Sequence, residues 1–173
     1  MRTAGVLAAL AVALVLQTTI AGMTMAGGSL VNMVLIAVVY VALAFGPVTG
    51  MLAGSAGGIL QDALSGGVVG IGGLAKTIVG FVVGVLGAQF IVSQPLPRLV
   101  MFVSATLVHE LCYEALYALV ESRGFSMQYS AVLTQAAVNG VIGVIAFQIV
   151  EGAPGLWQRR GARRTASVSR RRY

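Results

Sequence analysis

The ionisable side chains inside the apolar part of this chain are the ones that could carry chemistry. His109 and Glu110 stand near the middle of an apolar stretch, and Tyr113 and Glu114 follow them at a spacing of four residues. On a helix, the two pairs would lie on neighbouring faces. Such groups can form a pathway for protons or cations, or a static hydrogen-bond network that fixes how helices pack. The residue types leave both interpretations open.

The same segment does not carry the motif of an enzyme. His109-Glu110 begins the zinc-protease pattern HExxH, but residue 113, where the second histidine would stand, is a tyrosine. The sequence has one histidine, one cysteine (Cys112), no GxSxG nucleophile elbow and no GxxxxGK[ST] phosphate loop. We therefore predict a non-enzymatic protein with no metal and no cofactor.

Asp62 and Lys76 are two further ionisable residues within apolar sequence. Asp62 lies 15 residues beyond the helix-starting Pro47, which is about 22 Å along a helix. Glu114 lies 16 residues beyond Arg98, which is about 24 Å. Lys76 would open the next helix at a similar level, so we expect a buried cluster in which Lys76 lies between Asp62 and Glu114. The alternative is that Asp62 and Lys76 extend to the outer membrane interface.

The composition places these residues in an integral membrane protein. Of 173 residues, 58% are hydrophobic and 9% are charged, and the mean hydropathy is +0.93. A chain with so few polar residues cannot enclose a soluble core. We predict an all-α integral membrane protein, a compact bundle of about six transmembrane helices with short loops. The expected helices cover residues 4–22, 30–46, 47–64, 74–92, 98–120 and 130–150. The first apolar run is longer than that of a secretory signal, so we expect a retained helix.

The arginines predict the orientation of the bundle. Seven of them follow residue 151: Arg159, Arg160, Arg163, Arg164, Arg170, Arg171 and Arg172. In a six-pass arrangement, Arg2 and Arg98 fall on the same side as this run, which the positive-inside rule assigns to the cytoplasm. We therefore predict a transmembrane domain over residues 1–152, with both termini cytoplasmic, and a disordered basic tail over residues 153–173. The tail suits topology and contact with anionic lipids of the bilayer, and it lacks the interleaved aromatic residues that nucleic-acid binding would need.

Glycines spaced four apart predict close helix packing in two neighbouring segments. They are Gly46, Gly50, Gly54 and Gly58 in the first segment, and Gly80 and Gly84 in the second. Small residues at this spacing leave a groove on a helix into which another backbone can press, an arrangement favoured in lipid. The groove of the first segment could receive the second segment or the transmembrane helix of a partner protein. The sequence does not choose between them.

The first glycine series continues into Asp62, a glycine-rich connector and the second series. The pattern consists of Gly50, Gly54, Gly58, Asp62, Ser65-Gly66-Gly67, Gly70, Leu74, Gly80 and Gly84. It resembles the signature region of the rod shape-determining protein MreD family, and it covers about a quarter of the chain. Two features depart from the family: Leu30-Val31-Asn32-Met33 replaces the expected proline and acidic residue at the start of the second helix, and the basic tail is long.

The resemblance implies a non-enzymatic component of the bacterial inner membrane that helps organise lateral peptidoglycan synthesis and rod cell shape. The implied partners are the single-pass protein MreC and, through the complex, MreB filaments, RodA and its penicillin-binding protein. Two other interpretations stay open. The family's similarity to the substrate-binding subunits of energy-coupling-factor vitamin transporters would make the chain such a subunit, and the polar residues of segment 109–114 would also suit a small proton-coupled transporter.

Overall fold

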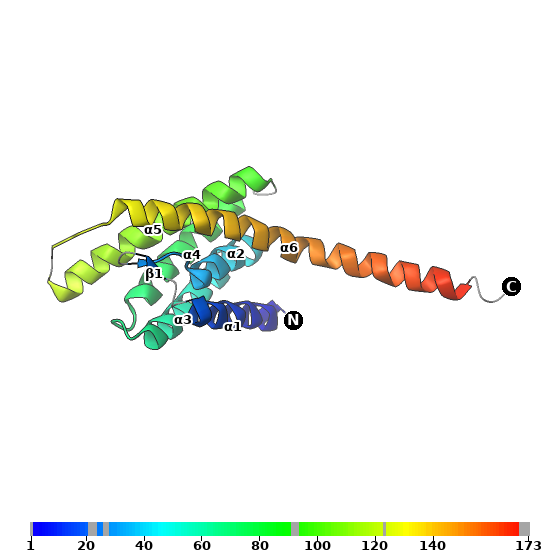
Figure 1. Ribbon diagram of the computed structural model, residues 1–173, viewed down its shortest axis with the longest axis horizontal. Helices are drawn as coiled ribbons and strands as arrows, with labels where there is room; N and C mark the ends of the chain where they lie inside the picture. Colours follow the sequence, from blue (N-terminus) through cyan, green and yellow to red (C-terminus); the bar gives the residue numbers. More distant parts are fainter. Residues whose placement is uncertain (1, 21–23, 26–27, 91–93, 123, 170–173) are drawn as a thin grey trace.

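Six helices form the fold in the computed structural model, which describes the backbone of residues 2–20, 24–25, 28–90, 94–122 and 124–169 and the side chains of residues 3–19, 30–90, 94–122 and 124–152. Within these ranges the helices are α1 (Arg2–Ile20), α2 (Met33–Phe45), α3 (Pro47–Ser65), α4 (Ile71–Gln89), α5 (Pro95–Glu121) and α6 (Tyr129–Ser169). Two short antiparallel strands, β1 (Thr24–Met25) and β2 (Gly28–Ser29), pair between α1 and α2. Each predicted helix is present, and α5 and α6 lie side by side (Figure 1).

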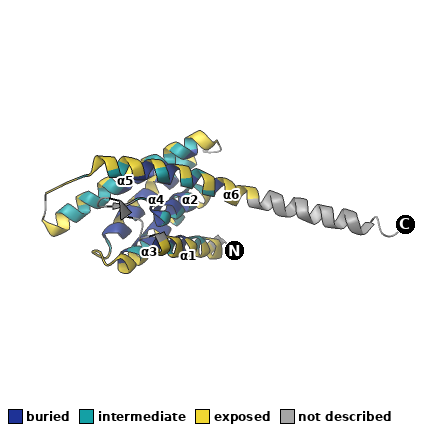
Figure 2. Cartoon of the chain, viewed as in Figure 1, coloured by how far each residue is buried: buried dark blue, intermediate teal, exposed yellow. Residues whose placement is uncertain are grey.

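The central helix is α2, which contacts each of the other five helices. Its apolar side chains belong to two hydrophobic clusters, one shared with α4, α5 and α6 and the other with α1 and α3. Figure 2 shows the buried residues gathered on α2 and on the parts of the neighbouring helices around it. With 13 residues, α2 is about 20 Å long, shorter than the roughly 30 Å hydrocarbon core of a bilayer.

The connections around α3 depend on glycine. Gly46 has φ 90° and is the single residue between α2 and α3, so the chain reverses there and Pro47 begins α3. Gly66 and Gly70, with φ 71° and 107°, bound the connector between α3 and α4. Positive φ is readily adopted only by glycine, because any other residue brings its Cβ too close to the backbone. The predicted breaker at Gly46-Pro47 therefore corresponds to a real turn.

Three helices in the described part of the chain are long and apolar enough to cross a membrane: α4, α5 and residues 129–152 of α6. Residues 3–19 of α1 and all of α2 are apolar but shorter. The glycine-rich α3, with Gln61 and Asp62 near its end, does not meet the same criterion. The structure therefore supports a membrane bundle, whereas six complete passes remain a prediction.

The last helix is longer than the sequence predicts. It begins at Tyr129, close to the predicted start, but continues to Ser169 instead of ending near residue 150. Its backbone is helical through most of the region expected to be a disordered tail. The side chains of Arg159, Arg160, Arg163 and Arg164 lie outside the described residues, as do Arg170, Arg171 and Arg172 entirely. The division of the chain at residue 152 therefore stays a prediction.

Candidate functional site

The glycine series of α3 packs directly on the backbone of α4. A Cβ added to Gly54 would lie 2.6 Å from the carbonyl carbon of Lys76, and one added to Gly58 would lie 2.5 Å from the Cα of Gly73. In both cases the obstacle is the backbone of the facing helix, which cannot rotate away as a side chain can. Only glycine permits this separation of the two helices.

The glycines of α4 have the same relation to α3. A Cβ on Gly80 would collide with the carbonyl group of Gly50, and a Cβ on Gly84 would collide with Pro47. The end of α4 therefore lies beside the start of α3, and the two helices run antiparallel. Gly46 differs, because nothing lies within 4 Å of its added Cβ and its positive φ serves the turn.

This packing decides between the two uses of the α3 groove. Gly50, Gly54 and Gly58 are buried, and the groove that they form is filled by α4 of the same chain. A transmembrane helix of a partner protein cannot occupy the same space. The partner-groove alternative is therefore wrong for these three glycines, and the contact is internal.

Asp62, which follows Gly58 at the same spacing, caps the start of α4. Its Oδ2 accepts hydrogen bonds from the backbone N–H groups of Gly70, at 2.9 Å, and Gly73, at 3.1 Å. The first N–H groups of a helix have no partner within the helix, and a carboxylate there is further stabilised by the helix dipole. A side chain at Gly72 would collide with Asp62. The glycines at the start of α4 thus let the backbone close around a buried carboxylate.

Lys76, His109 and Glu110 form a hydrogen-bonded chain from α4 to α5. Nζ of Lys76 lies 3.2 Å from Nε2 of His109, and Nδ1 of His109 lies 3.0 Å from Oε1 of Glu110. Lys76 is 2% exposed and His109 3%, whereas the Glu110 side chain is 21% exposed. An ammonium group can only donate, so Nε2 accepts and Nδ1 carries the hydrogen that Glu110 accepts. This assigns the tautomer of the imidazole.

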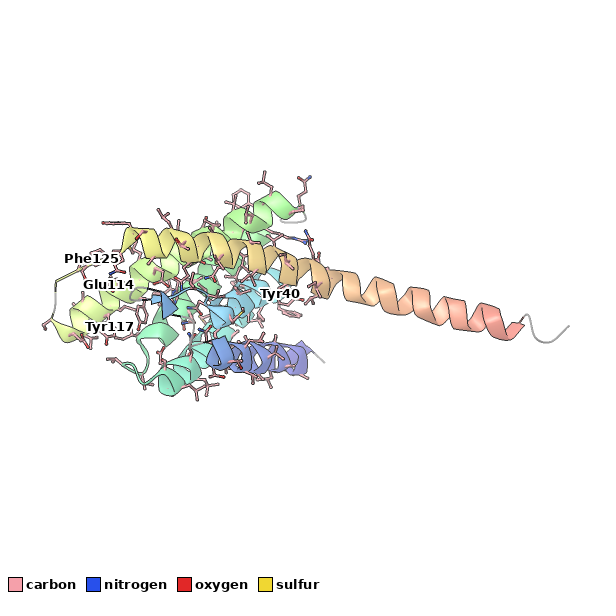
Figure 3. The ribbon with its side chains drawn as sticks, in the orientation of Figure 1. Tyr40, Glu114, Tyr117 and Phe125 are labelled. Carbon is pink, nitrogen blue, oxygen red and sulfur yellow. The ribbon has the colours of Figure 1, made fainter. Side chains whose placement is uncertain are left out.

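The predicted position of Lys76 between Asp62 and Glu114 is therefore only partly right. Asp62 and Glu110 act on Lys76 electrostatically, but its hydrogen bond goes to His109. Glu114 instead accepts a hydrogen bond from the N–H of Ser126, at 3.4 Å, and lies with Tyr117 toward the far end of α5 (Figure 3). Five residues advance a helix by about 500°, so Glu114 is rotated by about 140° from His109. The burial of Lys76 also contradicts the alternative that it extends to the interface.

The side chains of Lys76, His109 and Glu110 form hydrogen bonds and can exchange protons, but they are poorly suited to bind a metal ion. Among the described residues, no group of three or more histidine, cysteine, aspartate or glutamate side chains is placed to hold a metal ion. Cys112 is a free thiol, partly buried. What the arrangement can do chemically is fix two helices to each other and pass protons between neighbouring donors and acceptors.

A second polar network, which sequence reasoning missed, surrounds the start of α2. Oδ1 of Asn139 accepts a hydrogen bond from the N–H of Asn32, at 3.0 Å, and its Nδ2 donates to Oγ1 of Thr106, at 3.3 Å. Oε1 of Gln17 accepts from the N–H of Met33, at 2.7 Å. Side chains of α1 and α6 thus satisfy the start of the short α2, which can begin inside the protein. The sequence contained a signal for this network, because amide side chains such as those of Gln17 and Asn139 are uncommon in apolar helices and often form hydrogen bonds from one helix to another.

Arg98 has a structural role beyond the topological one predicted for it. Its side chain is 8% exposed, its Nη2 lies 2.8 Å from Oε2 of Glu151, and its guanidinium lies 4.0 Å from the centroid of the Phe147 ring. The Phe147 ring in turn makes an edge contact with Tyr40 of α2, with 5.0 Å between ring centroids. Arg98 therefore joins the start of α5 to α6 and, through Phe147, to α2.

Comparison with known proteins gives a single result. The family model described as rod shape-determining protein MreD matches residues 2–152. The matched range contains the α3–α4 glycine contact, Asp62 and the Lys76–His109–Glu110 chain. Neither the curated proteins nor the solved structures contain a match. Because the matched range covers most of the sequence, the chain belongs to the MreD family of membrane proteins, which act in rod shape determination.

Proposed function

We propose that this chain is a non-enzymatic scaffold of the bacterial elongation machinery, located in the inner membrane with both termini in the cytoplasm. In this role it binds MreC and helps organise lateral peptidoglycan synthesis, with MreB, RodA and its penicillin-binding protein joined through the same complex. The observation that carries the proposal is the family match over residues 2–152.

The packing of the bundle supports a role as a rigid binding platform. α2 contacts every other helix, and α3 packs on α4 backbone to backbone. Side-chain links also join separate helices: Lys76 to His109, Asn139 to Thr106, and Arg98 to Glu151. A surface built on helices held in this way needs little rearrangement when a partner binds.

The occupied glycine groove of α3 argues against one position for the partner. Because α4 fills the glycine groove of α3, the transmembrane helix of MreC must use another face of the bundle. Large apolar side chains are exposed along α1 and on the outer sides of α3 and α5. These faces contact lipid where no partner covers them, and a partner helix replaces the lipid there.

Co-purification from native membranes tests the proposal. The chain, tagged at its N-terminus and expressed from its own locus, is crosslinked in cells and purified in mild detergent, with an unrelated multi-pass protein of matched abundance as control. We expect an MreC-type single-pass protein and wall-synthesis proteins in the sample and not in the control. Recovery of an ATP-binding cassette module without any wall-synthesis protein would contradict the scaffold and favour the vitamin-transporter subunit.

A further inference from the structure

The layer of helices around α2 is open at one place. α2 contacts the five other helices, and these follow one another around it in the order α1, α3, α4, α5 and α6, each in contact with the next. In the described part of the chain, α6 and α1 do not close the layer with a contact of the same kind. In Figure 1, α2 is seen between α6 and α1. One side of α2 is therefore left open by the rest of the chain.

The open side of α2 is a narrow stripe of four residues, which we call the α2 seam. Met33, Ala37 and Tyr40 are partly exposed and Ala44 is exposed, whereas the remaining residues of 33–42 are buried. At about 100° per residue, the four positions fall within about 60° of the helix circumference. The exposure measures coverage by protein, so it holds whatever medium lies outside. The α2 seam is about 17 Å long, or about three helical turns.

Helices α1 and α6 stand on the two sides of the α2 seam. Met33 and Tyr40 pack against both hydrophobic clusters, the one that includes α6 and the one that includes α1. The Tyr40 ring contacts the ring of Phe147 on α6, with 5.0 Å between centroids. The N–H of Met33 donates to Oε1 of Gln17 on α1, at 2.7 Å. The seam is thus the floor of a groove whose walls are α1 and α6.

The spacing along the α2 seam is that of a contact between two helices. The steps from Met33 to Ala37, Tyr40 and Ala44 are four, three and four residues, which is the d–a–d–a order of a heptad. Large side chains alternate with alanines, so the surface has both knobs and holes for a facing helix. Lipid chains adapt to any apolar surface and need no such regular spacing. The pattern therefore favours a helix as the occupant.

The opening in the layer has the width of one helix. At the usual separation of about 8–10 Å between axes, there is room for about six helices around a central one. The chain itself supplies five of them. We propose that the groove between α1 and α6 binds the transmembrane helix of a single-pass partner on the α2 seam. The inference rests on the proposed function for the identity of this partner, MreC, and adds the place at which it binds.

The charge at one end of the groove fits such a partner. Glu151, near the end of the apolar part of α6, acts electrostatically on Tyr40 of the seam. Its Oε2 pairs with Arg98 at 2.8 Å, yet 53% of its side chain is uncovered by protein. In the proposed orientation this end faces the cytoplasm, where single-pass proteins carry lysine and arginine beside their transmembrane helix. A basic residue of the partner can therefore pair with Glu151 as its helix lies along the seam.

Photocrosslinking in cells tests the position of the partner. The photoreactive amino acid p-benzoylphenylalanine replaces Ala44 in the full chain, expressed from its own locus with an N-terminal tag. Matched controls carry it at Leu52 of α3 or Val100 of α5, which are 61% and 56% exposed on other faces of the bundle. After irradiation, the chain is purified and its adducts are identified by mass spectrometry. We expect an MreC adduct from Ala44 and only background from Leu52 and Val100.

A substitution on the floor of the groove gives a second readout. In Ala37→Phe the added ring takes the space of the facing helix, so the MreC adduct from Ala44 should fall about tenfold, as expected for overpacking at a close contact. Ala56→Phe, at an exposed alanine in the middle of α3, is the matched control and should leave the adduct unchanged. Thermal unfolding of both variants in bicelles checks that they fold.

Three results would overturn the groove. The first is an MreC adduct from Leu52 or Val100 without one from Ala44, in which case the proposed function stands and the partner binds elsewhere. The second is an Ala44 adduct with a second copy of the chain, or with lipid alone. The third is an equal Ala44 adduct in the wild type, Ala37→Phe and Ala56→Phe.

The proposed function and the groove fail in different ways. Absence of MreC from the co-purified material would contradict the proposed function, and the groove would lose its occupant with it. The Ala44 adduct is measured in a chain that is unchanged at every other position, so the first two results decide the matter even if Ala37→Phe does not fold.

Discussion

The close approach of α3 to α4 makes a quantitative prediction for Gly54→Ala. The added Cβ would lie 2.6 Å from the carbonyl carbon of Lys76, and ordinary contact begins at 3.4 Å. Because the carbonyl oxygen of Lys76 would lie closer still, the helices must separate locally by at least about 0.8 Å. Overpacking costs typically about 1–3 kcal/mol, and replacement of a helical glycine by alanine returns up to about 1 kcal/mol. Because the obstacle is the backbone of α4, in a row of similar contacts, we expect the free energy of unfolding to fall by about 2 kcal/mol in Gly54→Ala.

Gly5→Ala is the matched control for this prediction. Gly5 is also a helical glycine, in α1, and nothing lies within 4 Å of its added Cβ. It should gain up to about 1 kcal/mol from helix propensity, which makes the two variants differ by about 3 kcal/mol. The assay is reversible unfolding of the purified chain in bicelles, followed by circular dichroism. If Gly54→Ala is as stable as Gly5→Ala, the glycine contact does not determine the packing of α3 on α4.

Three further predictions use the same assay. Asp62→Ala leaves the N–H groups of Gly70 and Gly73 without their carboxylate and should cost about 1–3 kcal/mol, whereas Asp62→Asn keeps one oxygen acceptor and should cost less; an equal cost for both would refute the capping role. Asn139→Leu should cost about 2 kcal/mol, because the buried N–H of Asn32 and hydroxyl of Thr106 lose their hydrogen-bond partner. The control Gln148→Leu, at an exposed position of the same helix, should cost less than about 0.5 kcal/mol. Similar values for the two variants would contradict the network around α2. Arg98→Ala should destabilise more than Glu151→Gln, because the alanine also removes the contact with Phe147; the reverse order would contradict that contact.

The helices could be predicted from the sequence because each local signal agrees with the fold. Pro47 begins a helix, Gly46 precedes it with positive φ, and the apolar runs match α4, α5 and the first part of α6. The prediction for α2 was less accurate. The helix starts at Met33, after its capping residue Asn32, and not at residue 30. Its start is determined by Gln17 and Asn139, which are distant in the sequence.

The candidate site was predicted in part, because residue spacing gives depth along a helix more readily than rotation about it. The levels of Asp62, Lys76 and segment 109–114 were estimated by counting residues, and these groups do lie in one region. Which residue of α5 faces Lys76 depends on how α5 is rotated against α4. The packing places His109 beside Lys76, whereas Glu114 accepts a hydrogen bond from the N–H of Ser126. The contacts of Arg98 with Glu151 and Phe147 were not predicted, since charge alone does not reveal the ring of Phe147 beside it.

The incorporation of new wall material in living cells tests the proposed function most directly. The chain is depleted in its source bacterium, and insertion of a fluorescent D-amino acid is measured separately along the side wall and at the division site. We expect side-wall incorporation to fall toward background while incorporation at the division site persists, with recovery when the wild-type chain is supplied again. Unchanged side-wall incorporation in cells that no longer contain the chain would contradict a role in the elongation machinery.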